Sequence, residues 1–344
     1  MKLRIGVTGL GRIGWEHCRG LAEHPDYSLA GVADPVAERR AEAATKFGCA
    51  VFATHEELVA AGILDVIVIA SPTHLHKAMA VGAFKAGLHV LLEKPMAVTV
   101  ADARAIAQAA HRVKRILTVY QPHRLMPYHQ QIRQLIATGK IGQVYHVKRG
   151  AFGWGRRNDW QTLTKFGGGM LNNHGAHFID QLLDLTGRDV ERVFCRLGRV
   201  ATLGDAEDVV KLVYHTKAGM LGEVEINQAS PRPGYELEVY GTHGVLWKEV
   251  NTLKLRYFRP EELPPIELET SLASTGRRYP RDSAKFYDEA IPIDPQHAVN
   301  AYTDLAQAIR TGGEPYVKPA ETLAVMQLMA RARRDARRIV ATPI

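Results

Sequence analysis

The feature that most constrains the fold of this chain is a glycine-rich run near its start. Gly9-Leu10-Gly11-Arg12-Ile13-Gly14 follows a β-branched apolar segment, Leu3–Thr8, and precedes a helical pattern. In that order the first glycine permits a tight turn, the second lets the backbone approach a pyrophosphate, and the third lets helix pack on strand. The amide groups that open the helix would then face the phosphates. The run predicts a dinucleotide site contacted by Gly9, Gly11, Arg12, Ile13 and Gly14.

The same alternation of strand and helix continues through the first third of the chain. Further strands are predicted at Leu29–Ala33, Val66–Ala70, His89–Leu92 and Ile116–Val119, with helices between them such as Val36–Phe47 and Ala101–Val113. Repeated βαβ units imply an α/β fold with a parallel, doubly wound sheet. We therefore predict a Rossmann domain over residues 1–121.

The pattern changes after residue 121. Helices are predicted at Pro127–Thr138 and from about Gly169 to Leu185, on either side of a strand at Gln143–Phe152. Further strands then follow one another without an intervening helix: Val190–Arg199, Asp208–His215, Met220–Asn227, Tyr235–Tyr240, Val245–Val250 and Leu253–Phe258. Such a succession indicates an antiparallel sheet.

The end of the chain completes this second region. The stretch Pro260–Pro295 is predicted to be irregular, and two helices, about His297–Arg310 and Pro319–Val340, close the chain. Together these elements predict an α+β domain over residues 122–344. Whether its closing helices pack back on the first domain is left open.

Composition and charge narrow the class of protein. The longest apolar stretch, Val66–Ala70, is far too short to span a bilayer and no signal-peptide pattern opens the chain, so we expect a cytoplasmic protein without a membrane partner. The net charge is +8. Its one arginine cluster, however, lies on a predicted helix without a nucleic-acid motif: Arg331, Arg333, Arg334, Arg337 and Arg338. We expect no nucleic-acid partner, and a mild basic field would suit an anionic cofactor or substrate.

Other positions predict how the cofactor is held. Asp34 ends the second strand, where its carboxylate would accept hydrogen bonds from the adenosine ribose and repel a 2′-phosphate. This favours NAD, although Arg39 and Arg40 leave NADP open. After Ala70, the loop from Ser71 to His76 would line the nicotinamide side, because ligands bind beyond the carboxyl ends of the strands. Its predicted cofactor contacts are Ser71, Pro72, Thr73 and His76, and we favour a polar loop over a metal pair of His74 and His76.

Two further motifs supply candidate catalytic groups. Glu93-Lys94-Pro95 ends the next strand, where Lys94 would either stabilise a developing alkoxide or be an ordinary surface lysine. The segment Gly167–Asp180, if helical, places Asn173 and His177 on one face. A histidine is suited to take a hydroxyl proton as hydride leaves, because its unperturbed pKa is about 6.5. The alternative for His177 is a buried structural role. We predict no metal, because neither the histidines nor the three scattered cysteines have ligand spacing.

With these motifs the sequence resembles the glucose–fructose oxidoreductase, myo-inositol dehydrogenase and rhizopine catabolism family, Gfo/Idh/MocA. The resemblance covers nearly the whole chain and rests on the glycine run, Pro72, His76, Glu93-Lys94-Pro95 and Gly167–Asp180. It implies a Rossmann domain followed by a domain with a large open antiparallel sheet. It also implies that His177 exchanges the substrate proton while Lys94 holds the reacting oxygen. Glu93 and Lys94 would adjoin the cofactor.

The resemblance further implies a sugar, a cyclic polyol or a derivative as substrate, and a homodimer or homotetramer. One departure is Asn173, where many polyol dehydrogenases of the family carry Asp four residues before the histidine. An amide still orients a hydroxyl, but it supplies no negative charge to raise the basicity of His177. We keep Asn173 as a candidate catalytic residue. The predicted substrate contacts are Lys94, Arg124, Trp154, Arg156, Trp160, Asn173 and His177, with an interdomain or subunit contact as the alternative for the tryptophan loop.

The sequence thus favours NAD-dependent oxidation of a secondary hydroxyl on a sugar or polyol, or the reverse reduction. One alternative is a redox-neutral glycosidase or lyase that retains its NAD and oxidises the substrate transiently. Another is a dinucleotide-binding regulator without chemistry, against which the presence of both Lys94 and His177 argues.

Overall fold

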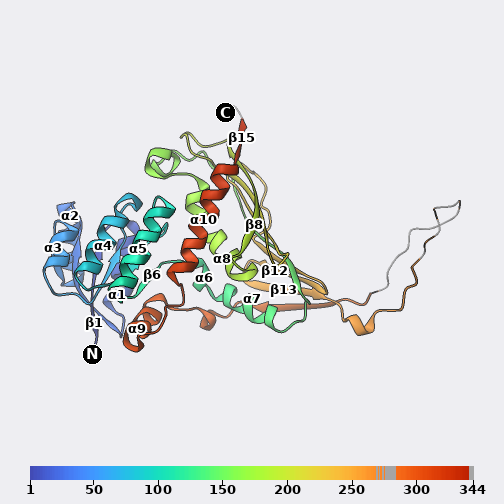
Figure 1. Ribbon diagram of the computed structural model, residues 1–344, viewed down its shortest axis with the longest axis horizontal. Helices are drawn as coiled ribbons and strands as arrows, with labels where there is room; N and C mark the ends of the chain where they lie inside the picture. The colour runs from blue at the N-terminus through green and yellow to red at the C-terminus, as the bar shows by residue number, and fades with distance from the viewer. Residues whose placement is uncertain (269, 271, 273–274, 276–283, 341–344) are drawn as a thin grey trace.

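The computed structural model describes every residue except 269, 271, 273–274, 276–283 and 341–344, and two sheets organise what it describes (Figure 1). The first sheet is parallel, with the strand order β3-β2-β1-β4-β5-β6. Its strands are β1 (Leu3–Thr8), β2 (Tyr27–Ala33), β3 (Ala50–Phe52), β4 (Val66–Ile69), β5 (His89–Leu92) and β6 (Leu117–Val119). Its helices are α1 (Arg12–Ala22), α2 (Ala37–Phe47), α3 (His55–Ala60), α4 (His76–Lys85) and α5 (Val100–Arg112).

This sheet confirms the predicted doubly wound fold. Every residue of β4 is buried, which accounts for its unbroken run of Val and Ile. The strand order reverses between β1 and β4, so their carboxyl ends open a crevice of the kind in which ligands bind. The sequence did not predict β3, because this edge strand is short and largely exposed and so carries no apolar pattern.

The second sheet has the order β14-β13-β12-β11-β7-β10-β9-β8-β15. Its strands are β7 (Val144–Phe152), β8 (Val190–Arg199), β9 (Val209–Thr216), β10 (Leu221–Asn227), β11 (Leu237–Gly241), β12 (Gly244–Glu249), β13 (Thr252–Tyr257), β14 (Tyr287–Pro292) and β15 (Arg337–Val340). Most pairs are antiparallel as predicted, but β7 pairs with β10 in parallel, and β15 with β8. The sheet is therefore mixed, with β7 in its middle between β11 and β10.

The last third of the chain corrects two predictions. The stretch Pro260–Pro295 is not wholly irregular, because β14 pairs with β13. The final helix, α10 (Pro319–Asp335), ends five residues early, because Ala336 adopts an extended backbone and β15 follows. Arg337 and Arg338 therefore lie on a strand rather than on a helix face. Between these segments lies α9 (Ala301–Thr311).

Both closing helices pack on the first sheet's core. Leu305 of α9 joins the cluster around Ile5 and Val7, and Met326 of α10 joins the cluster around Ile67. The opposite side of α10 contributes Leu328 to the core of the second sheet. Figure 1 shows α10 running between the two sheets, next to α5 and α8. In the part of the chain that the structure describes, no helix combines the length and apolar character needed to cross a membrane.

The remaining helices are α6 (Pro122–Leu125), α7 (Pro127–Ala137) and α8 (Ala176–Thr186). The predicted helix from Gly169 to Leu185 is in fact two elements, because a π-helical turn at Leu171–Gly175 precedes α8. A π turn is wider than an α turn, so residues four apart across it no longer stack as in an α-helix. The face predicted to be shared by Asn173 and His177 therefore does not form as a regular helical face.

Candidate active site

The glycine run forms a turn that fits a dinucleotide pyrophosphate. Gly9 has a φ of +90°, and a side chain on it would meet the Ala70 carbonyl. A Cβ on Gly14 would collide with the Gly9 carbonyl, whereas one on Gly11 would meet nothing within 4 Å. The backbone at Gly11 thus borders open space. Because α1 begins there with neither a side-chain cap nor an acidic residue in its first turn, its amide groups are free for an anion.

Asp34 lies beside this turn but is bonded to the backbone. Its Oδ2 accepts from the Leu10 amide at 2.7 Å, its Oδ1 accepts from the Val36 amide at 2.9 Å, and Arg39 lies 3.5 Å from Oδ2. Arg12, Arg19 and Arg39 line an adjoining pocket of about 370 Å³. The ribose contact of Asp34 stays a prediction, and these cations keep NADP open. Ile13 is partly exposed at the start of α1.

The loop after β4 corrects the prediction for His76. This residue is buried, and its two ring nitrogens lie 2.9 Å and 3.0 Å from the carbonyls of Ser71 and Pro95. It therefore ties the loop to the Lys94-Pro95 segment and has no free nitrogen for a cofactor. The buried Oγ of Ser71 has no partner among the described residues, so it remains available to a ligand. Pro72 and Thr73 open a short 3₁₀ turn, Thr73–Leu75.

Lys94 reaches from the first sheet to the π-helical turn. Its Nζ donates to the Asn173 carbonyl at 3.2 Å. The Glu93 carboxylate is bonded within the protein, because Oε1 bonds His17 and Oε2 accepts from the Lys94 amide, and the contact of Glu93 with a cofactor stays a prediction. Burial lowers the pKa of Lys94 from its usual 10.5, with Glu93 opposing the shift and Arg12 adding to it.

His177 lies at the start of α8 and is 7% exposed. Its Nδ1 is 3.2 Å from Oε1 of Gln121, which follows β6. If the amide oxygen accepts from Nδ1–H, the Nε2 atom carries the lone pair. The His123 ring stacks on His177 with centroids 4.4 Å apart and an interplanar angle of 3°. Burial, and then the positive charge of Lys94, hold the pKa of His177 well below 6.5.

Arg149, Phe178 and His174 pack around the stacked rings of His123 and His177. The Arg149 guanidinium lies over Phe178, 4.0 Å from the ring centroid. The rings of His123 and His174 pack on the same phenyl ring, with centroid separations of 5.9 Å and 5.8 Å. Burial and the Arg149 charge lower the pKa of His123 to about 4. Burial and the Lys94 charge lower the pKa of His174 in the same direction. These histidines are therefore neutral at pH 7.

Arg124 does not reach the site as predicted. It is 1% exposed and its guanidinium bonds Asp180 of α8 and Glu321 of α10. The Nε to Asp180 Oδ2 distance is 2.8 Å, and a second nitrogen bonds Oδ1 of the same carboxylate. Arg124 thus joins three helices and is not a substrate contact.

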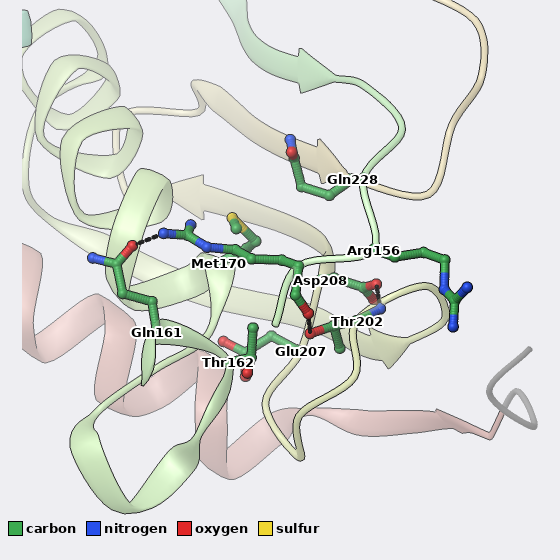
Figure 2. Close-up of a pocket in the computed structure, with 10 residues that line it drawn as sticks. Arg156, Gln161, Thr162, Met170, Thr202, Glu207, Asp208 and Gln228 are labelled. Atoms are coloured by element: carbon green, nitrogen blue, oxygen red, sulfur yellow. Dashed lines mark hydrogen bonds between the residues drawn. The ribbon is translucent and has the colours of Figure 1, made fainter. Parts of the chain in front are cut away.

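The loop after β7 borders a pocket of about 320 Å³ (Figure 2). Arg156, Gln161 and Thr162 line it from this loop, and Thr202, Glu207 and Asp208 line it from the β8–β9 connection. Asn173 reaches the pocket by donating from its side-chain amide to Oε1 of Gln161 at 3.4 Å.

Trp154 and Trp160, from the same loop, are 53% and 59% exposed and do not line this pocket. Their predicted substrate contact stays a prediction, as does the alternative subunit contact.

Sequence reasoning missed Gln121, His123 and Arg149. A positional signal existed for Gln121, because it follows a parallel strand at the carboxyl edge. Arg149 occupies an inward position of β7 two residues after buried Val147, where a charged residue is unusual. Nothing local marks His123.

Comparison with known proteins places these residues in a family. Residues 3–121 match the oxidoreductase family with an NAD-binding Rossmann fold, Gfo/Idh/MocA, and residues 129–247 match a Gfo/Idh/MocA C-terminal domain. The rhizopine catabolism protein MocA of Rhizobium meliloti is 31% identical over 248 residues, which are 71% of this chain and 77% of that protein. The chain belongs to the Gfo/Idh/MocA family. It is an NAD(P)-binding oxidoreductase, as the sequence predicted.

Two further relatives span more of the chain. The NAD-dependent scyllo-inositol 2-dehydrogenase of Bacillus subtilis is 25% identical over 330 residues, 92% of this chain and 89% of that protein. The crystal structure of an NAD-binding protein from Listeria innocua superposes with a TM-score of 0.83 at 25% identity, covering 97% of each chain.

Proposed function

We propose that this protein oxidises a secondary hydroxyl of a sugar, cyclic polyol or derivative with NAD, or catalyses the reverse reduction. The observation that carries the proposal is that the Lys94 ammonium contacts the π-helical turn that leads into His177. Lys94 lies at the carboxyl end of the cofactor-binding sheet, and its Nζ contacts the turn that leads into His177. The names of the inositol dehydrogenase and rhizopine catabolism relatives support a polyol substrate.

The side chains divide the chemistry between them. His177, neutral because its pKa is lowered, accepts the hydroxyl proton at Nε2 while Gln121 holds Nδ1–H. The Lys94 ammonium donates to the substrate oxygen and stabilises its developing negative charge. Asn173 holds Lys94 through its carbonyl and is oriented by Gln161. The glycine turn, α1 and Ser71 would hold NAD(P), which would supply the hydride chemistry at the substrate carbon.

The test is NADH appearance when purified protein and NAD meet a panel of sugars, sugar acids and inositols, with NADP in parallel. We expect reduction with at least one polyol class, and the active epimers would locate the reacting carbon. Consumption of a glycoside without NADH, by protein that keeps NAD through desalting, would contradict the proposal and favour the redox-neutral alternative.

We also propose that the chain forms a homodimer or homotetramer through the second sheet. Exposed Tyr145 and Phe194 on β7 and β8 support this proposal. Light scattering on the eluting protein tests it, and a monomeric mass at micromolar concentration would contradict it.

A further inference from the structure

Two cations of the site have no carboxylate partner. Arg149 is 8% exposed, and its hydrogen bonds go to neutral acceptors, the Gln181 amide and the carbonyls of Gly150 and Glu236. Lys94 donates only to the Asn173 carbonyl. Among the described residues, neither cation has a carboxylate oxygen within 4.0 Å, and both Glu93 oxygens bond other groups. Buried charges in proteins are almost always paired.

The neighbouring rings add polar atoms without partners. The Nδ1 atoms of His123 and His174 are buried and unbonded among the described residues. Both rings contact Phe178, on whose face Arg149 lies. Asn173, beside the Lys94 ammonium, is an amide and adds no negative charge. These groups therefore combine positive charge with unbonded ring nitrogens, whereas the carboxylates Glu207 and Asp208 line the separate pocket next to Gln161.

An anionic ligand would complete this arrangement. Its charge would offset the desolvation of Arg149 and, at longer range, of Lys94, and its oxygens would accept hydrogen bonds from the guanidinium and from ring N–H groups of the neutral histidines. A neutral polyol would leave both cations unpaired, which is the less stable outcome in a partly buried site.

We propose that the substrate is a sugar or polyol that carries an anionic group, a carboxylate or a phosphate ester, bound beside Arg149 and the ring N–H groups of His123 and His174. This inference rests on the proposed function for its sugar scaffold. The anionic group is separate from the reacting hydroxyl, which His177 and Lys94 approach.

Matched ligands test the charge directly. Calorimetric titration of NADH-loaded protein would compare D-glucose with D-glucuronate and D-glucose 6-phosphate, and D-galactose with D-galacturonate and D-galactose 6-phosphate. We expect at least one anionic member to bind about tenfold or more tightly than its neutral partner. The uronates and phosphates distinguish the two anion classes. Equal or tighter binding of the neutral member in both series would overturn the inference.

Three variants show whether Arg149 is the cause. Arg149→Gln should remove most of the preference, and Arg149→Lys should keep most of it. Lys148→Gln is the matched control, because Lys148 precedes Arg149 on β7 but pairs with Glu238 at 3.0 Å; it should leave the preference unchanged. Loss of preference in Lys148→Gln as well would contradict a role specific to Arg149.

The binding and turnover results separate the two proposals. NADH formation from neutral polyols with no anion preference would leave the proposed function standing and reject the anionic substrate. Tight uronate or phosphate binding without NADH formation from any panel member would support the anionic ligand and reject the proposed dehydrogenase function.

Discussion

Two buried arginines bond to α8, and they differ in what they meet there. Arg124 faces Asp180, which is fully buried, and is joined by Glu321. Arg149 faces the Gln181 amide, one residue further along the helix, and no carboxylate of the described residues pairs with it. Both arginines are nearly inaccessible to solvent. Both guanidinium groups are charged, but carboxylates within the protein balance the charge of Arg124 and not that of Arg149.

The two arginines that contact α8 therefore have different roles, one in stability and the other in ligand binding. A paired buried arginine fixes the packing of its neighbours, and removing it leaves an uncompensated carboxylate. An arginine without a carboxylate partner keeps its charge for a ligand. His177 lies on the same side of the comparison as Arg149. Burial and the positive charge of Lys94 together lower its pKa.

We expect the largest effect for the two candidate catalytic residues. Lys94→Ala and His177→Ala should each lower kcat by about 10²- to 10⁴-fold, because each removes a group acting on the reacting oxygen. Lys77→Ala, which removes an exposed lysine paired with Asp102, is the control and should keep turnover. Steady-state NADH formation measures kcat, and circular dichroism shows whether each variant is folded. Near-normal kcat in a folded Lys94 or His177 variant would remove that residue from the mechanism.

On the structural side, Arg124→Leu should destabilise the protein by about 3–5 kcal/mol, because Asp180 would remain buried without its partner. Arg149→Gln should cost less than half as much, because it leaves no carboxylate behind. Urea unfolding of the two variants beside the wild type gives the comparison. Equal losses of unfolding free energy would show that the two arginines do not differ in the way we argue.

The dependence of rate on pH sharpens the view of His177. Because its folded pKa lies well below 6.5 and the base must be neutral, kcat/KM should be level near pH 7. Below a midpoint that is itself under 6.5, it should fall about tenfold per pH unit. The lowered pKa of Lys94 predicts a second fall at alkaline pH, with a midpoint below 10.5. An acidic midpoint at or above 6.5 would contradict a buried, cation-flanked base.

The smallest effect concerns the cofactor end. Asp34→Ala should weaken the preference for NAD over NADP by about tenfold, because the carboxylate no longer repels a 2′-phosphate. The ratio of kcat/KM values for the two cofactors measures this. An unchanged ratio would assign Asp34 only to the Leu10 and Val36 amides that it already binds.

Much of the fold could be read from local pattern, because it depends on local physics. Buried strands such as β4 are continuous apolar runs, and the glycine turn has positions that steric contact reserves for glycine. The sequence pointed to Lys94 and His177 as candidates, but not to Gln121, His123 and Arg149, the polar groups around His177. Arg124 meets Asp180 and Glu321 across 56 and 197 residues, so no local pattern could distinguish it from a cleft residue. Short elements such as β3 and β15 depend on pairing to a neighbouring strand and leave little local trace.

The central claim is that hydride passes between NAD and a substrate carbon bearing a hydroxyl. For a substrate found in the panel, deuterium placed on that carbon would be followed into the reduced cofactor by mass spectrometry. The account predicts NADH carrying one deuterium, together with the ketone product, from the wild type, and at least a hundredfold less from His177→Ala. Substrate conversion with no deuterium in the accumulated cofactor would contradict it.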